Sequence, residues 1–119
     1  MSKVRAGSLG EALPAPGGPE HFNTLVRSGM ARVERIVSHG HASATGAWYD
    51  QDWDEFVLVV TGSAALAIEG EATARQLRPG DWVFLPRRTR HRVDATDADG
   101  PTVWLAVHVG EAGGKAAAG

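Results

Sequence analysis

Alternation of apolar and polar residues dominates the middle of the chain and predicts a series of short β-strands. From Met30 onward, segments rich in β-branched and aromatic residues are separated by turn-forming Gly, Pro and Asp residues. The predicted strands cover residues 31–38, 46–53, 55–61, 64–69, 72–77, 82–85, 91–96 and 102–109. Short strands at this spacing favour an all-β fold, either an antiparallel sandwich or a barrel.

The two flanks of this region follow other patterns. Residues 20–27 place Phe22, Leu25 and Val26 on one side of a helix, so a short N-terminal helix is predicted there, with an extended arm as the alternative. Residues 1–19 and 110–119 lack a hydrophobic period and are rich in small residues, which cannot offset the entropy lost on ordering. We therefore expect a flexible, dispensable N-terminal tail (1–19), one domain (20–109) and a similar C-terminal tail (110–119).

Composition narrows the functional classes. A chain of 119 residues has room for a single core, and its net charge of -2 argues against a nucleic-acid partner. The absence of Cys excludes disulfides and thiolate metal sites, and no phosphate-binding or dinucleotide motif predicts a nucleotide cofactor. The longest apolar run, residues 56–60, is too short to span a bilayer, and the N-terminus does not resemble a signal peptide. We expect a soluble, cytoplasmic protein without a membrane partner.

Two ionisable residues are predicted to face the interior. Glu55 shares its strand face with Val57 and Val59, which are typical core residues. His91 alternates with Val93 in a later strand, whose opposite face carries charged residues. A buried charge needs a partner or a metal, and glutamate and histidine are common ligands of transition metals.

The residues around this pair resemble the cupin family. Glu55-x6-Gly62 is similar to the end of the first cupin motif, and Gly80-x5-Pro86-x4-His91 is similar to the second. The resemblance extends over roughly residues 33–109 and implies a single jelly-roll β-barrel with a pocket in its mouth. Cupins include enzymes, binding proteins and storage proteins, so the resemblance implies a fold more strongly than a function.

The first motif departs from the cupin pattern. The usual His-x-His pair, three or four residues before the glutamate, is replaced by Tyr49-x-Gln51 or, with the other spacing, by Trp48-x-Asp50. The resemblance still implies a divalent iron, manganese, nickel or zinc ion, held by Glu55 and His91 with help from Gln51 or Tyr49. The alternative is that Glu55 and His91 hydrogen-bond each other in a metal-free pocket.

Further pocket candidates lie outside the motifs. His39 and His41 form a His-x-His pair too far from Glu55 for the motif; we expect His39 in an exposed turn and His41 nearer the pocket. Arg90, next to His91, is a candidate for binding a carboxylate or phosphate at the pocket mouth.

The last predicted strand offers two more candidates. Trp104 and His108 share one of its faces, and aliphatic residues occupy the other, so the pattern leaves open which face lies inside. If the barrel mouth takes Trp104, His108 also lines the pocket.

Three kinds of function follow. The first is a metal-dependent enzyme, such as an oxygenase or isomerase, that acts on a small organic substrate in the barrel mouth. The second is a metal-free isomerase or cyclase, with Glu55 as base and Tyr49 as a second catalytic candidate. The third is a non-catalytic binding or sensor module for a small molecule. Sheet edges and apolar outer faces also predict a homodimer.

Overall fold

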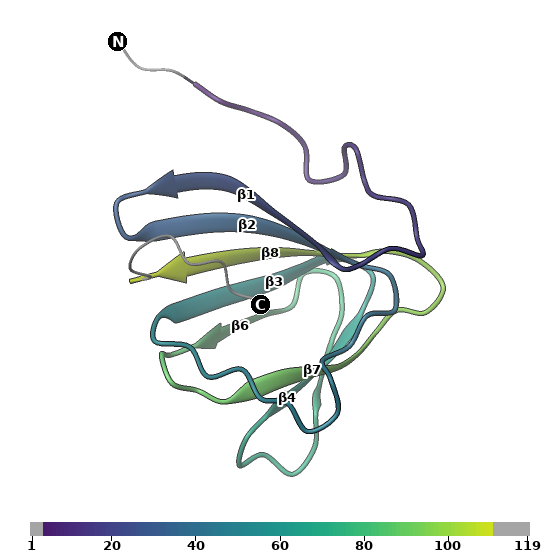
Figure 1. Cartoon of the computed structure of the whole chain (residues 1–119), viewed down its shortest axis with the longest axis vertical. Coiled ribbons are helices and arrows are strands. Elements are labelled where there is room, and N and C mark those ends of the chain that lie inside the picture. The colour runs from purple at the N-terminus through teal and green to yellow at the C-terminus, as the bar shows by residue number, and fades with distance from the viewer. Residues whose placement is uncertain (1–3, 111–119) are drawn as a thin grey trace.

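The computed structural model describes residues 4–110, which form eight β-strands and no helix (Figure 1). The strands are β1 (His21–Ser28), β2 (Ala31–Ser38), β3 (Asp54–Thr61), β4 (Ala64–Ile68), β5 (Arg75–Leu77), β6 (Trp82–Leu85), β7 (His91–Thr96) and β8 (Thr102–Val109). The predicted all-β class is confirmed. No helix in this part of the chain is long and apolar enough to cross a membrane. Residues 111–119, nearly all of the predicted C-terminal tail, lie outside the described residues.

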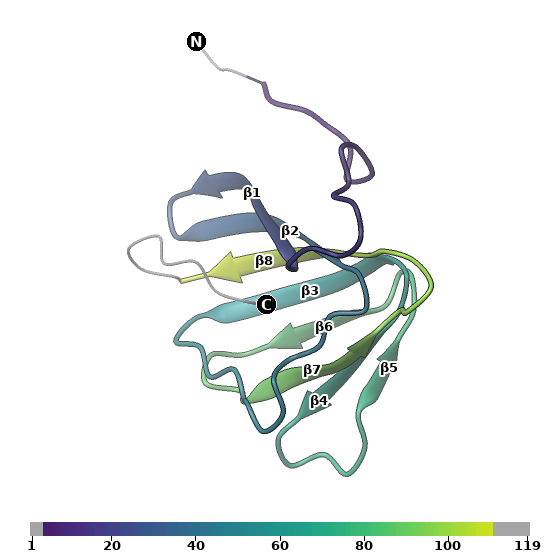
Figure 2. The same ribbon diagram turned by 45° about the vertical axis from the view of Figure 1, so that its right-hand side comes forward.

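The strands form two antiparallel sheets that face each other, as a jelly-roll barrel requires. The larger sheet has the order β1-β2-β8-β3-β6 and the smaller one the order β5-β4-β7 (Figure 2). Strand β8 lies in the middle of the larger sheet, paired with β2 along its whole length, from Ala31↔Val109 to Ser38↔Thr102. Residues distant in the sequence thus become neighbours across β2, β8 and β3.

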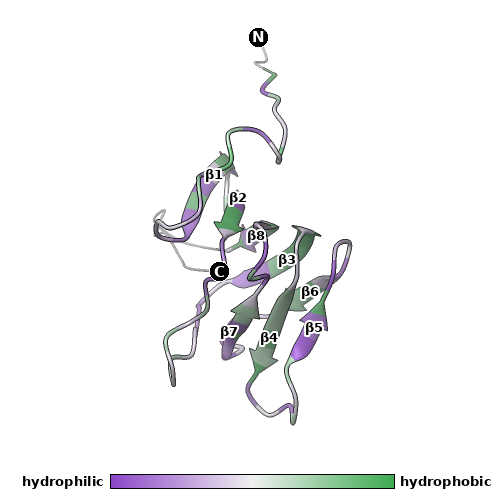
Figure 3. Ribbon diagram, turned by 90° about the vertical axis from the view of Figure 1, so that its right-hand side faces the viewer, coloured by the Kyte–Doolittle hydropathy of each residue, from purple (hydrophilic) through white to green (hydrophobic). Residues whose placement is uncertain are grey.

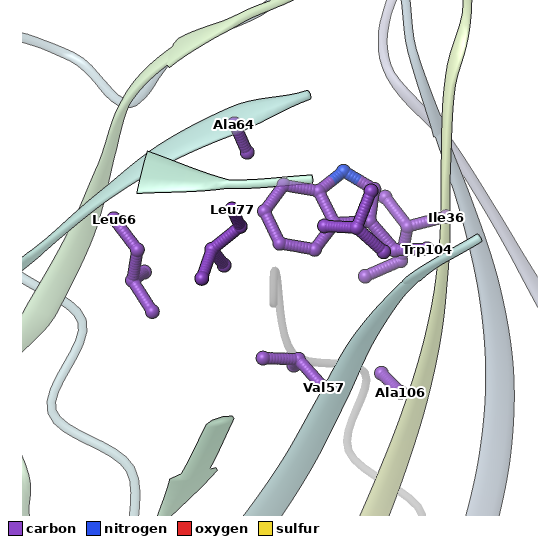
Figure 4. Close-up of a cluster of buried hydrophobic side chains, with 8 residues drawn as sticks. Ile36, Val57, Ala64, Leu66, Leu77, Trp104 and Ala106 are labelled. Carbon is purple, nitrogen blue, oxygen red and sulfur yellow. The ribbon is translucent and has the colours of Figure 1, made fainter. Parts of the chain in front are cut away.

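The hydrophobic core fills the space between the two sheets. Trp104 of β8 lies beside Ile36 of β2, and Leu66 and Leu77 reach toward them from the smaller sheet (Figure 4). Strands β3, β4 and β6 consist mostly of hydrophobic residues, whereas β5 is largely hydrophilic (Figure 3). Burial of these apolar side chains on both inner faces drives the packing of the sheets.

Gly62 fixes the turn between β3 and β4. Its φ is +83°, and a Cβ there would lie 2.5 Å from Oγ1 of Thr102 and 2.7 Å from the carbonyl oxygen of Pro101. Both the backbone conformation and the close approach of β8 therefore require glycine.

Three sequence predictions of local structure are wrong, one of them only in part. Residues 20–27 do not form a helix; most of them belong to β1, which pairs with β2 from His21↔Val37 onward. The extended form is favoured because the segment pairs with β2 and contains β-branched residues. The helical pattern covers only a few positions and does not outweigh this pairing. Residues 46–53 form no strand beyond an isolated bridge between Tyr49 and His91, and residues 72–74 likewise precede β5 without joining it.

The segment before β1 has no regular secondary structure but makes specific contacts. Arg35 of β2 donates hydrogen bonds from Nη1 to the carbonyl oxygens of Leu9 (3.2 Å) and Glu11 (2.6 Å). The first described residues then extend away from the sheets (Figures 1 and 2). Leu9 and Glu11 thereby accept two hydrogen bonds from a guanidinium that is only 7% exposed, and Oδ1 of Asn23 accepts another from Nη2 (2.8 Å).

Candidate functional site

A narrow pocket opens between the two sheets. Its walls are mostly apolar side chains from β2, β3, β4, β6, β7 and β8, and its polar lining residues are Glu20, Ser43, Tyr49 and His91. The cavity volume, about 20 Å³, is enough for one or two water molecules, so an organic molecule enters only if part of the wall moves outward. Ser43 and Tyr49 belong to the connection between β2 and β3, so one wall consists of loop rather than strand.

His91, the first residue of β7, lines this pocket and has one free ring nitrogen. Its backbone is held by Tyr49, which donates to the His91 carbonyl (2.7 Å) and accepts from the His91 amide (3.1 Å). The Thr89 carbonyl lies 2.9 Å from Nδ1 and can only accept, so Nδ1 carries the hydrogen and Nε2 has the lone pair. Nε2 has no hydrogen-bond partner, although the side chain is 1% exposed. Burial lowers the pKa of His91, opposed by the hydrogen bond to Thr89, and thereby favours the neutral ring.

Glu55 lies next to the free ring nitrogen of His91. Its side chain, at the start of β3, is fully buried, with Oε1 3.9 Å from Nε2 of His91 and Oε2 3.7 Å from Nε2 of His108. The two predicted residues are therefore brought together, and β8 adds a second imidazole that the sequence pattern left undecided.

Burial dominates the protonation of Glu55. Desolvation raises the pKa of Glu55 from 4.5 to about 7. His108 opposes this effect most strongly, Glu34 adds to it by like-charge repulsion, and the side-chain amide of Gln51 lowers the pKa again. The carboxyl group is therefore close to half-ionised at neutral pH.

Two buried residues of β2 extend the site and were missed by the sequence analysis. Arg32 and Glu34, 1% and 2% exposed, form an ion pair of 2.5 Å. Oε1 of Glu34 lies 3.6 Å from Nε2 of His108, which continues the chain of contacts to Glu55. The available signal was that Arg32 and Glu34 share the alternation of the core residue Ile36.

Several atoms of this buried polar cluster (Arg32, Glu34, Glu55, His91, His108) have no hydrogen-bond partner. They are Oε1 of Glu34, both carboxylate oxygens of Glu55, Nε2 of His91 and both ring nitrogens of His108. Buried polar atoms are nearly always satisfied in native proteins, so this concentration marks a place for water or for a polar group of a ligand.

The inner face of β8 is also settled. Trp104 and His108 both point inward, 4% and 0% exposed, with Ala106 between them. Trp104 lines the pocket and donates from Nε1 to Oγ of Ser38 (3.2 Å), whereas His108 lies in the buried polar cluster.

The remaining candidates lie elsewhere. Arg90 pairs with Glu69 (3.0 Å) and does not line the pocket. His41 is also absent from the pocket wall; its Nε2 and that of His39 lie 2.9 Å from the carbonyl oxygens of Gly18 and Pro14. Both histidines thus hold the segment that leads into β1.

A metal ion fits this donor set only in part. Within residues 4–110, no three side chains of His, Cys, Asp or Glu are placed to hold a metal ion. His91 supplies one free donor atom and Glu55 two, and the nearby Gln51 and Tyr49 would add neutral oxygens only, which are weaker ligands of transition metals.

Comparisons with known proteins agree with the fold. A family model described as "Cupin domain" matches residues 33–108. A protein from Ralstonia eutropha JMP134, provisionally described as a mannose-6-phosphate isomerase, is 44% identical, with a TM-score of 0.88 over 91% of this chain and 100% of that one. No curated protein matches the sequence.

More distant structures share the fold alone. A cupin superfamily protein from Desulfitobacterium hafniense DCB-2 is 15% identical, with a TM-score of 0.72 over 93% of this chain and 95% of that one. The polyketide cyclase RemF from Streptomyces resistomycificus is 18% identical, with a TM-score of 0.65 over 76% of this chain and 64% of that one.

Proposed function

The chain belongs to the cupin family, and we propose that it is an enzyme that transfers protons on a small organic substrate, as an isomerase or cyclase does. One observation carries the proposal: the Glu55 carboxyl group lies 3.9 Å from the free Nε2 of His91 in a buried site, with its pKa raised to about 7. A group whose pKa is near the working pH is efficient both in accepting and in releasing a proton.

His91 is the residue of this pair that meets the substrate. Its Nε2 carries a lone pair, because Nδ1–H donates to Thr89, and His91 lines the pocket, so in our proposal Nε2 contacts the substrate. Nε2 accepts a proton from a substrate carbon or oxygen, and the Glu55 carboxylate stabilises the resulting imidazolium. The same proton returns to a different substrate atom, so the pair ends in its starting state.

Tyr49 is the second catalytic candidate. It lines the pocket with its ring centroid 5.6 Å from that of His91. In our proposal its hydroxyl group donates a hydrogen bond to a substrate oxygen on which negative charge develops during proton transfer.

The 44% identical protein from Ralstonia eutropha supports this reaction class, because its provisional description is that of an isomerase. Interconversion of an aldose and a ketose moves protons between neighbouring carbon and oxygen atoms, which is the step that a buried acid–base pair catalyses.

A proton-exchange experiment tests the proposal even while the natural substrate is unidentified. A panel of small hydroxyketones and cyclic ketones is incubated with the protein in D₂O, and NMR measures deuterium uptake next to the carbonyl group. We expect catalysed exchange that falls by about 10²–10⁴-fold in His91→Ala and in Glu55→Gln. Glu69→Gln, which removes an exposed carboxylate outside the pocket, is the matched control and keeps the wild-type rate.

Two results would contradict proton transfer by this pair. One is exchange at the wild-type rate in both variants. The other is the absence of catalysed exchange across the panel, which favours a binding or sensor module that uses the same pocket.

A metal-dependent reaction is the second candidate, favoured by the free donor atoms of His91 and Glu55. A divalent iron, manganese, nickel or zinc ion, when bound, would supply Lewis-acid or oxygen-activating chemistry. Element analysis of untagged protein tests it: stoichiometric metal is expected to be lost in His91→Ala and Glu55→Ala, and less so in Gln51→Ala. Wild-type protein that retains no metal after loading with each ion contradicts this candidate.

A further inference from the structure

We infer that the substrate of this pocket is a neutral or cationic molecule with an apolar body and a hydroxyl or ammonium group that binds Glu20, and not a phosphorylated or carboxylated one. The inference rests on the proposed function for the identity of the pocket. It adds the substrate class and assigns Glu20, in the segment before β1, as the residue that selects it.

Glu20 is held in the pocket wall by a hydrogen-bonded chain. Nε1 of Trp104 donates to Oγ of Ser38 (3.2 Å), and that hydroxyl donates to Oε2 of Glu20 (2.5 Å). Ser38 is fully buried, and Trp104 is 4% exposed. The chain fixes one carboxylate oxygen of Glu20, and the described part of the molecule offers its other oxygen, Oε1, no hydrogen bond. That oxygen is therefore available to accept from a ligand.

The pocket places its polar groups apart from each other on an apolar lining. Glu20 is linked through Ser38 to Trp104, whereas the free Nε2 of His91 lies near Glu55, which contacts His108 four residues further along β8. Phe22, Ile36, Trp104 and other apolar side chains make up the rest of the lining. A molecule that contacts both polar places must have a mostly apolar body and a hydrogen-bond donor that reaches Glu20.

The charges around the pocket disfavour an anion. No Arg or Lys within residues 4–110 lines it, and Arg90, the cation nearest to His91 in the sequence, is paired with Glu69. The buried Arg32 is paired with Glu34 and is not part of the lining. Phosphate and carboxylate groups are normally bound by Arg, Lys or clustered backbone amides, so a bound anion would face Glu20 without a compensating cation.

Three probes of one size separate the relevant charges: benzyl alcohol, benzylammonium and benzoate. Binding is measured near neutral pH by NMR, from the indole N–H signal of Trp104, assigned with Trp104→Phe. We expect saturable shifts with benzyl alcohol and benzylammonium, and binding of benzoate that is weaker by about tenfold or more. Mannose 6-phosphate is expected to cause no saturable shift.

Glu20→Gln identifies the source of the selectivity. The amide oxygen can still accept from Ser38, so benzyl alcohol is expected to bind as before while benzylammonium loses about tenfold in affinity. Glu69→Gln removes the same charge outside the pocket and is expected to leave all affinities unchanged.

The inference is overturned if benzoate or mannose 6-phosphate binds as tightly as benzylammonium. It is also overturned if Glu20→Gln leaves the preference intact, or if neither benzyl alcohol nor benzylammonium binds. These measurements need no turnover. Charge-selective binding without catalysed deuterium exchange therefore overturns the proposed function alone, and exchange without charge selectivity overturns the substrate class alone.

Discussion

Burial, more than any neighbouring charge, determines how Glu55 behaves. Its carboxyl group is fully buried, and desolvation is the largest cause of a pKa near 7. The positive charge on Arg32 does little to reverse this, because Arg32 is already paired with Glu34. A buried carboxyl group whose pKa lies near neutral pH is a feature of acid–base sites rather than of structural ion pairs.

Replacing Glu55 by Gln is expected to change how the stability of the protein depends on pH. The folded pKa (about 7) is raised above the unfolded value (4.5), so the stabilising contribution of this group is present below pH 4.5 and is lost as pH rises through 7. Wild-type protein should lose about 2–3 kcal/mol through this group between about pH 5 and pH 8, and Glu55→Gln should not.

Urea unfolding at the two pH values, with Glu69→Gln as the exposed control, measures the difference. An equal pH dependence in wild type and Glu55→Gln would mean that the buried carboxyl group titrates as an exposed one does.

The sequence predicted part of this site and missed the rest for a physical reason. Alternation with valines placed Glu55 and His91 inside, because apolar neighbours on one strand face mark the core. The same rule applies to Arg32 and Glu34, which share a strand face with Ile36. However, two charged side chains on one strand face normally predict a face exposed to solvent. Only the pairing of β2 with β8 shows that they neutralise each other inside the barrel.

At the scale of elements, turn chemistry was more informative than periodicity. The predicted spans 31–38, 82–85, 91–96 and 102–109 coincide with β2, β6, β7 and β8, because Gly, Pro and Asp residues mark their ends. The helix predicted over residues 20–27 is wrong. In so short a segment the hydrophobic positions fit a helical and an extended period equally well, and only the pairing with β2 decides between the two.

Gly62 and Gly80 offer a matched test of the turns. Both have positive φ (+83° and +93°), but a Cβ at Gly62 would collide with Thr102, whereas Gly80 has nothing within 4 Å. Gly80→Ala is expected to lower the free energy of unfolding by about 1 kcal/mol, from backbone strain alone. Gly62→Ala is expected to lower it by about 3 kcal/mol or more, because β8 must also shift. Equal losses in chemical denaturation would show that β8 gives way without cost.

At the scale of the whole molecule, the segment before β1 joins the barrel to its pocket. Its backbone accepts hydrogen bonds from Arg35, and its last residue, Glu20, reaches the pocket wall. The expected homodimer stays a prediction; Trp82 and Phe84, 61% and 50% exposed on the edge strand β6, are apolar surface that it could cover.

Truncation decides between the two views of this segment. Its sequence predicts that residues 1–19 are dispensable. Its contacts predict instead that their removal takes away the hydrogen bonds that the Arg35 guanidinium donates to Leu9 and Glu11. From the contacts we expect a loss of about 1–3 kcal/mol, or a fall in Tm of several degrees. Deletion of residues 1–3 alone is the control. An unchanged Tm after deletion of residues 1–19 would support the dispensable tail.

The central claim is that Glu55 and His91 form a buried acid–base pair that exchanges protons near neutral pH. The most direct measurement is an NMR titration of the ¹³C-labelled side-chain carboxyl of Glu55, assigned with Glu55→Gln. The account predicts a midpoint near pH 7. A midpoint near 4.5, the ordinary value for a glutamate, would contradict it.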